Sequence, residues 1–111
     1  MSYPEPLPNP FPFVPKCVFT DVDDTPTYNG KLPVETLSAL VELQTAGVSV
    51  VPVTGGCSGW CDCMLRTWPI QTIIGENGAV WMWLDNEGKL KRQFLQGEEQ
   101  RKANIQDLEA I

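Results

Sequence analysis

The sequence predicts an α/β fold built on a parallel sheet, and three observations lead to that class. Short apolar runs rich in β-branched residues alternate with stretches of helical periodicity, in the order strand, helix, strand, helix, strand. The first run stops at a cluster of aspartates, and the second stops at a threonine followed by two glycines. Because ligands of open α/β sheets bind beyond the carboxyl ends of the strands, both strand ends are candidate site positions.

Length and charge limit the classes of function. A chain of 111 residues has the size of one domain with a modest core. Its formal net charge of −6 and its lack of histidine argue against a general affinity for nucleic acid or for anionic membranes. The N-terminus has no signal-peptide pattern, and no apolar stretch approaches the length of a membrane span. We therefore expect a soluble, cytoplasmic protein without a nucleic-acid or membrane partner.

Residues 1–15 form a proline-rich N-terminal arm. The segment holds six of the ten prolines, a spacing that forbids helix and sheet and favours an extended polyproline II conformation: Pro4, Pro6, Pro8, Pro10, Pro12 and Pro15. A disordered or loosely docked tail is the alternative. A ligand for a proline-recognition domain is disfavoured, because no basic residue flanks the repeat.

The run from residue 17 to 19 predicts a buried parallel strand that ends abruptly at Asp21. The D-x-D-x-T sequence over 21–25 then places several carboxylates at the strand end. A calcium loop is excluded, since Pro26 and Leu32 occupy the positions that require Gly and Glu. Taken alone, the motif leaves open that the acidic residues merely end a strand and begin a solvated turn.

A turn-forming run over 26–30 precedes a helix predicted over 33–46. Pro33 in the first turn, Glu35 near the positive end and Gly47 as terminator set its bounds. Its apolar side chains fall mostly on one stripe, which we expect to pack against the sheet: Val34, Leu37, Leu40, Val41 and Leu43.

The second strand is predicted over 48–53 and closes with Thr54-Gly55-Gly56. Ser58 is the expected cap of a helix that runs to about Thr67, with Pro69 beyond its end. Four large residues of this segment are interpreted as packing residues rather than as a ligand cage: Trp60, Met64, Leu65 and Trp68.

Four cysteines are too few and too clustered for a secreted disulfide scaffold. The C-x-x-x-C-x-C spacing of Cys57, Cys61 and Cys63 is compatible with a soft metal, but the chain has no histidine to complete a zinc site. A reduced, partly buried cluster on a helix is the favoured interpretation.

A third strand is predicted over 71–75, followed by a tight turn at Glu76-Asn77-Gly78, a hairpin over 79–95 and a helix over 98–111. Asn77 is suited to the left-handed conformation of such a turn.

The D-x-D-x-T motif after an apolar strand resembles motif I of the haloacid dehalogenase (HAD) superfamily. Thr54, after the second strand, resembles motif II. The G-E-N-G-A sequence over 75–79 resembles the large-cap (type IIB) subfamily, which includes sugar-phosphate phosphatases. The resemblance covers roughly residues 16–95.

The resemblance implies a hydrolase that works through an aspartyl-phosphate on a small phosphomonoester such as a sugar phosphate. Asp21 would be the nucleophile and Asp23 the general acid and base. Both are the candidate ligands of Mg²⁺, the cofactor that the family normally uses. The resemblance places Thr25, Thr54, Gly55 and Asn77 on the substrate side.

The fold implied by the resemblance is a three-layer Rossmann-like α/β sheet, truncated, with a β-hairpin leading to a cap. Its parts would be the arm over 1–15, a partial core with the hairpin over 16–95, and a helix over 96–111 that begins a cap or forms a C-terminal tail.

The sequence departs from the family at several points. Pro26 replaces the usual Leu and removes an amide beside the phosphate site, and Gly56 replaces a frequent Arg. In the family, a Lys or Arg and an acidic pair follow further along the sequence, and neither has a counterpart here.

Two functions therefore stand: a HAD-type phosphatase that is incomplete as given, or a catalytically inactive remnant that serves as a binding or oligomeric module. An exposed sheet edge would favour a homo-oligomer.

Overall fold

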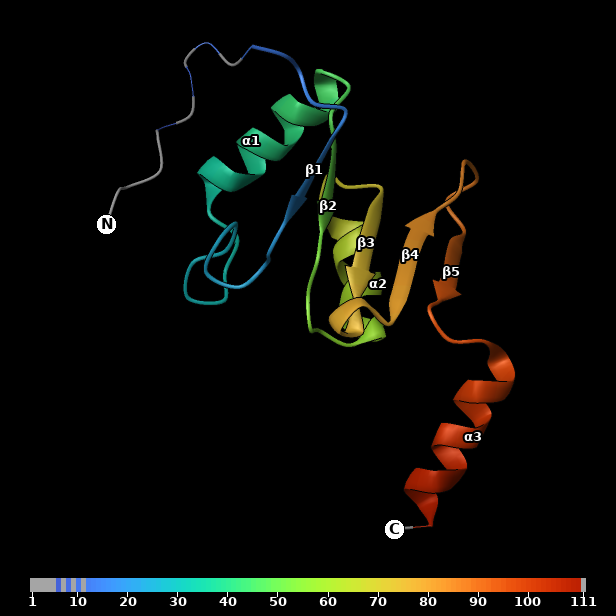
Figure 1. The fold of residues 1–111 in the computed structure, drawn as a ribbon. Helices are drawn as coiled ribbons and strands as arrows, with labels where there is room; N and C mark the ends of the chain where they lie inside the picture. The colour runs from blue at the N-terminus through green and yellow to red at the C-terminus, as the bar shows by residue number, and fades with distance from the viewer. Residues whose placement is uncertain (1–5, 7, 9, 11, 111) are drawn as a thin grey trace.

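The computed structural model describes residues 6, 8, 10 and 12–110, and its elements follow the predicted order (Figure 1). They are β1 (Cys17–Thr20), α1 (Val34–Thr45), β2 (Ser49–Pro52), α2 (Ser58–Thr67), β3 (Thr72–Gly75), the 3₁₀ turn η1 (Glu76–Gly78), β4 (Val80–Leu84), β5 (Leu90–Phe94) and α3 (Glu98–Glu109).

The sheet runs in the order β1, β2, β3, β4, β5. β1 pairs in parallel with β2, in a register that sets Cys17 opposite Ser49 and Thr20 opposite Pro52. A parallel bridge between Val53 and Ile74 joins β2 to β3. β4 is antiparallel to both β3 and β5, so the strand direction first reverses at η1, before the predicted hairpin. The first three strands therefore point their carboxyl ends to the same edge.

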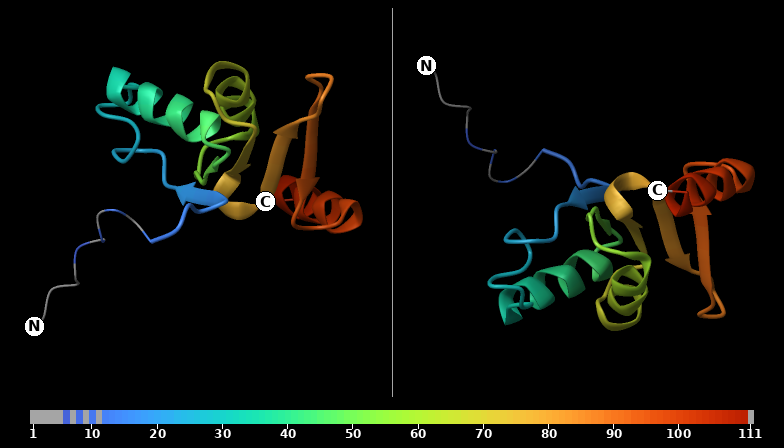
Figure 2. Two further views of the ribbon diagram at one scale, coloured as in Figure 1. Left: turned by 90° about the horizontal axis from the view of Figure 1, so that it is seen from above. Right: turned by 90° about the horizontal axis from the view of Figure 1, so that it is seen from below.

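Helices α1 and α2 lie on the same face of the sheet, and the core fills the space beneath them (Figure 2). Its centre consists of side chains from both layers, all fully or nearly fully buried: Val50, Cys61, Met64, Ile73, Val80 and Met82. The Rossmann-like α/β class is confirmed. Of its three layers, the described residues form the sheet and one helical layer.

β1 is less buried than its sequence predicts. Phe19 is 65% exposed and Cys17 is also exposed, whereas Val18 and Thr20 on the other side of the strand are half-buried. The reason is that β1 is an edge strand with one covered face. The expectation of a fully buried strand was wrong.

The apolar stripe of α1 is only partly used. Leu40 is buried and Leu43 packs against the core, but Val34 is 74% exposed and Leu37 and Val41 also face solvent. α1 lies over the margin of the sheet, where β2 is its main neighbour. A helix at this margin can bury only a narrow part of its stripe.

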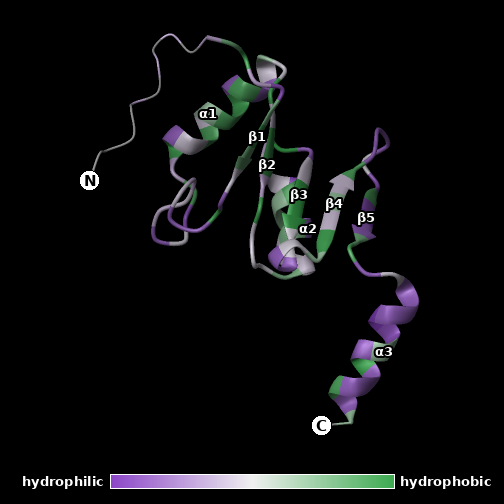
Figure 3. Cartoon of the chain, in the orientation of Figure 1, coloured by the Kyte–Doolittle hydropathy of each residue, from purple (hydrophilic) through white to green (hydrophobic). Residues whose placement is uncertain are grey.

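The C-terminal helix α3 is polar and exposed. Figure 3 shows α3 as mainly hydrophilic, and its Ile105 and Leu108 are exposed. Part of the expected proline arm (1–5, 7, 9 and 11) and the end of the expected last helix (111) lie outside the described residues. Within the described part of the chain, no helix has the length and apolarity needed to cross a bilayer.

Close packing between α2 and β3 generates a stability prediction. A Cβ atom added at Gly75 would overlap the sulfur of Cys61, which is fully buried. We expect Gly75→Ala to lower the free energy of unfolding by about 1–3 kcal/mol, because the core must shift to accept the methyl group. Urea denaturation measures this change. In a Cys61→Ala background the obstruction is gone, so the same substitution should cost less; an equal cost in both backgrounds would contradict the packing argument.

Candidate active site

The carboxyl ends of β1 and β2 bring the two predicted motifs to one edge of the sheet. The N–H of Val53 donates to the carbonyl of Thr20 at 2.7 Å, which extends the parallel pairing to the last residue of β1. The N–H of Thr54 donates to the carbonyl of Ile74 at 2.9 Å. Asp21 follows β1 directly, and Thr54 follows β2 after one residue. The structure therefore places both residues at neighbouring strand ends.

The aspartate loop is anchored by one buried side chain and one buried hydroxyl. Val22 is 2% exposed and points into the core, whereas Asp21 and Asp23 on either side of it are exposed. The hydroxyl of Thr27 donates to the carbonyl of Val22 at 2.8 Å and accepts the N–H of Asp24 at 3.2 Å. This arrangement turns both predicted catalytic carboxylates outward.

Thr25 acts on Asp21 directly. Its hydroxyl donates to Oδ2 of Asp21 at 3.2 Å. That contact occupies one carboxylate oxygen and orients the side chain, which leaves Oδ1 to face a ligand. Thr25, which the resemblance places on the substrate side, thus has a positioning contact within the loop.

Residues 26–30, which we call the flap, form a tight turn, as predicted. Tyr28 and Lys31 pair across it, and Asn29 and Gly30 adopt positive φ angles of 51° and 73°. The hydroxyl of Thr36 donates a hydrogen bond to the carbonyl of Pro26 at 2.7 Å, which connects the turn to the first part of α1.

The Thr54 loop leaves its hydroxyl proton available. The N–H of Gly56 donates to Thr54 Oγ1 at 3.0 Å, so the oxygen acts there as acceptor. A hydroxyl has one proton and two lone pairs, and Thr54 can therefore still donate to an anion. Thr54 is only 8% exposed, which limits its access to a small ligand group.

Gly55 packs closely against its neighbour across the loop. A Cβ atom at this position would lie 2.7 Å from Oδ1 of Asn77. The amide of Asn77 therefore rests directly against the backbone of the predicted phosphate loop, so that Gly55 and Asn77 lie side by side.

The η1 turn is bound to the Thr54 loop through its backbone. The N–H of Glu76 donates to Gly56 O at 2.9 Å, and the N–H of Asn77 donates to Thr54 O at 3.1 Å. Glu76 and Asn77 hold positive φ angles of 50° and 56°, which costs backbone energy in residues other than glycine. The predicted left-handed role of Asn77 is confirmed, and the same conformation aims two amides at the Thr54 loop.

Ser58 does not cap α2 as the sequence predicts. It is the first helical residue after Cys57, and its hydroxyl donates to Oε1 of Glu76 at 2.9 Å. Its N–H approaches the same oxygen at 3.4 Å. Glu76 thus supplies a carboxylate to the positive end of α2 from another loop. Sequence reasoning missed Glu76 because the two residues lie 18 positions apart.

The four cysteines are free thiols, and Cys57 and Cys63 are exposed. Burial raises the pKa of the Cys61 thiol, and the nearby Cys57 and Glu76 raise that pKa further. Among the described residues, no group of three His, Cys, Asp or Glu side chains could hold a metal ion. Asp21 and Asp23 offer the hard oxygen atoms that suit Mg²⁺. Because two side chains are too few for its coordination sphere, water and substrate would have to supply the remaining ligands.

Of the packing residues predicted on α2, Met64 and Leu65 are buried and Trp68 packs at the margin of the core. Trp60 is instead 48% exposed. Its ring lies beside Gly56, where a Cβ atom would approach the Trp60 ring to 3.0 Å. Trp60 therefore borders the Thr54 loop.

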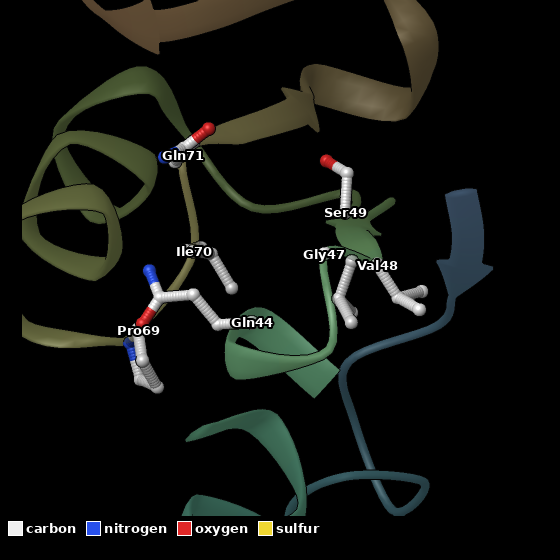
Figure 4. A pocket seen from close by; sticks show the side chains of 8 residues that line it. Gln44, Gly47, Val48, Ser49, Pro69, Ile70 and Gln71 are labelled. Carbon is white, nitrogen blue, oxygen red and sulfur yellow. The ribbon is translucent and has the colours of Figure 1, made fainter. Parts of the chain in front are cut away.

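A hollow of about 160 Å³ lies at the opposite ends of the strands, before β2 and β3 begin. Gln44, Val48, Pro69 and Ile70 are among its lining residues (Figure 4). It is separated from the carboxylates by the length of the strands, so we assign it no part in the site.

Several solved structures resemble this chain, and three of them are described here. A haloacid dehalogenase-like hydrolase from B. subtilis is 29% identical over 81% of the chain, with a TM-score of 0.58. A protein from Thermoplasma acidophilum is 21% identical over 81%, with a TM-score of 0.61. A structure from Bacteroides thetaiotaomicron, described among phosphatases of the HAD superfamily, is 20% identical over 84%, with a TM-score of 0.59. The chain spans 31%, 40% and 34% of their respective lengths.

No protein-family model and no curated protein matches the chain. The two less similar structures show the fold, and the B. subtilis structure also supports the family.

The contact of Glu76 with α2 can be tested by stability. We expect Glu76→Ala to lower the free energy of unfolding by about 1 kcal/mol, as for a lost helix cap. Glu76→Gln keeps an oxygen acceptor, so its free energy of unfolding should lie between those of the unchanged chain and Glu76→Ala. Urea denaturation supplies the measurement. Glu87→Ala is the control, because the only contact of the Glu87 side chain among the described residues is an exposed ion pair with Lys89 at 3.7 Å. If the Glu76 and Glu87 variants are equally stable, the capping role is refuted.

Proposed function

Because the chain belongs to the haloacid dehalogenase superfamily, we propose that its Asp21 and Thr54 loops form the phosphate-handling part of a phosphatase for a small phosphomonoester. The observation that carries the proposal is the meeting of these loops at adjacent carboxyl ends of parallel strands. A sugar phosphate as substrate, and the large-cap subfamily, rest on the G-E-N-G-A turn. A cytoplasmic location belongs to the same proposal.

In the first step, Oδ1 of Asp21 attacks the phosphorus atom while Thr25 holds the other carboxylate oxygen. A bond forms between Asp21 and phosphorus, and the bond to the substrate oxygen breaks. Asp23 in its acid form donates a proton to the leaving alkoxide. The hydroxyl of Thr54 donates to a phosphoryl oxygen at the neighbouring strand end.

In the second step, Asp23 as carboxylate takes a proton from water. The water oxygen attacks phosphorus, the Asp21–phosphorus bond breaks, and inorganic phosphate leaves with the Asp21 carboxylate restored. Asp23 regains its acid form, and protons and charge balance over the two steps.

Asp21 and Asp23 are the residues that would hold Mg²⁺. When bound, the ion neutralises the charge that otherwise keeps a phosphate away from two carboxylates. With two carboxylates rather than a larger acidic group, we expect weak metal affinity and a strong dependence on the bound phosphate for additional oxygen ligands.

A second candidate is a remnant without catalytic activity that keeps a binding or oligomeric role. Phe19 and Trp81 lie exposed on the sheet face opposite the helices, an arrangement typical of an interface.

Phosphatase activity is tested by hydrolysis of p-nitrophenyl phosphate by the purified chain with and without Mg²⁺. We expect Mg²⁺-dependent turnover that Asp21→Asn abolishes, because an amide cannot serve as the nucleophile. Asp107→Asn, on the exposed surface of α3, is the control for the change in net charge and should retain activity. Absence of turnover in a folded sample would refute the active-enzyme proposal and favour the remnant.

A further inference from the structure

A second cavity, of about 320 Å³, lies where η1, the end of β5 and α3 meet. β5 runs in the same direction as β3, so it ends at the edge of the sheet that also carries the two candidate loops. α3 continues beyond that edge (Figure 1). Small-molecule sites in proteins have cavities of about 300–1,000 Å³ with mainly apolar walls and a few placed polar groups. This cavity, which we call the α3 cavity, has such a composition, with apolar walls and polar groups from Phe94, Leu95, Ile105, Gln96, Arg101 and Asn104.

α3 turns polar side chains inward and leaves its apolar ones outside. Of the residues of this helix, Arg101 and Asn104 are half-buried and all others are exposed. The two are three positions apart, so they share one face of the helix. Ile105 and Leu108 stay 51% and 69% exposed. A helix that only packs on a core buries its apolar residues, so the inward polar pair indicates another role for this face.

Arg101 is held in place without being neutralised. Its guanidinium carbon lies 3.3 Å from the centre of the Phe94 ring, which is a cation–π contact. In the part of the chain that the structure describes, no carboxylate pairs with this guanidinium, whereas the neighbouring Lys102 pairs with Glu98 at 3.1 Å. A guanidinium stays charged at physiological pH and carries only donors. Arg101 therefore brings an oriented positive charge with free N–H groups to the α3 cavity.

The two amides of the α3 cavity are fixed by one chain of hydrogen bonds. Nε2 of Gln100 donates to Oδ1 of Asn104 at 2.9 Å, and Nδ2 of Asn104 donates to Oε1 of Gln96 at 2.9 Å. Because an amide nitrogen carries two protons, Asn104 keeps one N–H and Gln96 keeps two for a ligand. These free groups are donors, like those of Arg101. Donors around a positive charge select a ligand with negatively charged oxygen atoms.

Glu76 is the one carboxylate among the residues that line the α3 cavity. Its Oε1 accepts the hydroxyl of Ser58 at 2.9 Å. The positive end of α2 therefore stabilises the charge of Glu76. Glu76 is thus engaged on the other side of η1 and leaves Arg101 available.

We propose that the α3 cavity binds a small organic anion. Its oxyanion head, a carboxylate or a phosphoryl group, meets Arg101, Gln96 and Asn104, while its apolar part lies against the apolar walls. A planar guanidinium can hold either kind of oxyanion through two parallel hydrogen bonds. None of these residues belongs to the loops of Asp21 or Thr54. The proposal therefore does not depend on the proposed phosphatase function, and either can fail without the other.

The test is a titration of the ¹⁵N-labelled chain, without Mg²⁺, followed by the chemical shifts of its amides. The probes are benzoate and phenylphosphonate, whose carbon–phosphorus bond a phosphatase does not hydrolyse. We expect saturable shifts at η1 and residues 94–105, with a Kd on the order of 1 mM for ligands of this size. The probe that binds more tightly identifies the head group. Benzamide, the neutral counterpart of benzoate, should bind about tenfold more weakly because it lacks the charge.

Arg101→Gln should weaken the binding of benzoate by about tenfold, because it removes the charge-assisted hydrogen bonds. Lys102→Gln is the matched control. It makes the same change in net charge on the same helix, but Lys102 is exposed and pairs with Glu98, so its loss should leave binding unchanged. The dispersion of the amide spectrum establishes that each variant is folded.

Three results would overturn the proposal: no saturable shift with either probe, equal affinity for benzamide and benzoate, or equal weakening by Arg101→Gln and Lys102→Gln. Shifts confined to residues 53–56 would place the anion at the Thr54 loop and would also overturn it.

Discussion

The site depends on the register between β1 and β2. With Thr20 opposite Pro52, the Asp21 and Thr54 loops leave the sheet side by side, and the bridge from Val53 to Ile74 carries the alignment on to β3. A slip of one residue would turn Val18 out of the core and exchange the two faces of β1. Burial of Val50 and Ile73 under the helices therefore fixes both the fold and the positions of the functional side chains.

The second constraint is the junction of the Thr54 loop with η1. Two backbone hydrogen bonds, the carboxylate of Glu76 at the start of α2 and the tight fit of Asn77 on Gly55 hold two left-handed residues in place. The strain of those residues is offset by contacts that all converge on one loop. Rigidity of this kind would suit the proposed phosphate contact, since a donor such as the Thr54 hydroxyl must be positioned before the anion arrives.

Local signals explain why the sequence predicted the strand and helix order, the tight turn at Asn77 and the placement of Asp21 and Thr54 at strand ends. The errors have a different origin. Whether Phe19 is buried depends on what covers β1, and whether Ser58 caps its own helix depends on Glu76, a residue distant in sequence. The buried hydroxyl of Thr27 likewise gave no signal, because nothing in its neighbourhood indicates that it binds the carbonyl of Val22. Tertiary contacts decide such points, and patterns along the chain do not contain them.

The order in which the chain can fold follows from the two kinds of strand pairing. β3, β4 and β5 are joined by short turns, so their contacts close small loops, whereas β1 meets β2 only after the whole flap and α1 have been traversed. Closing the larger loop costs more chain entropy, and such contacts form late. The hairpin half of the sheet is thus the natural nucleus. The loop that carries Asp21 then becomes ordered only after β1 has paired with β2, so the two candidate loops come together late in folding.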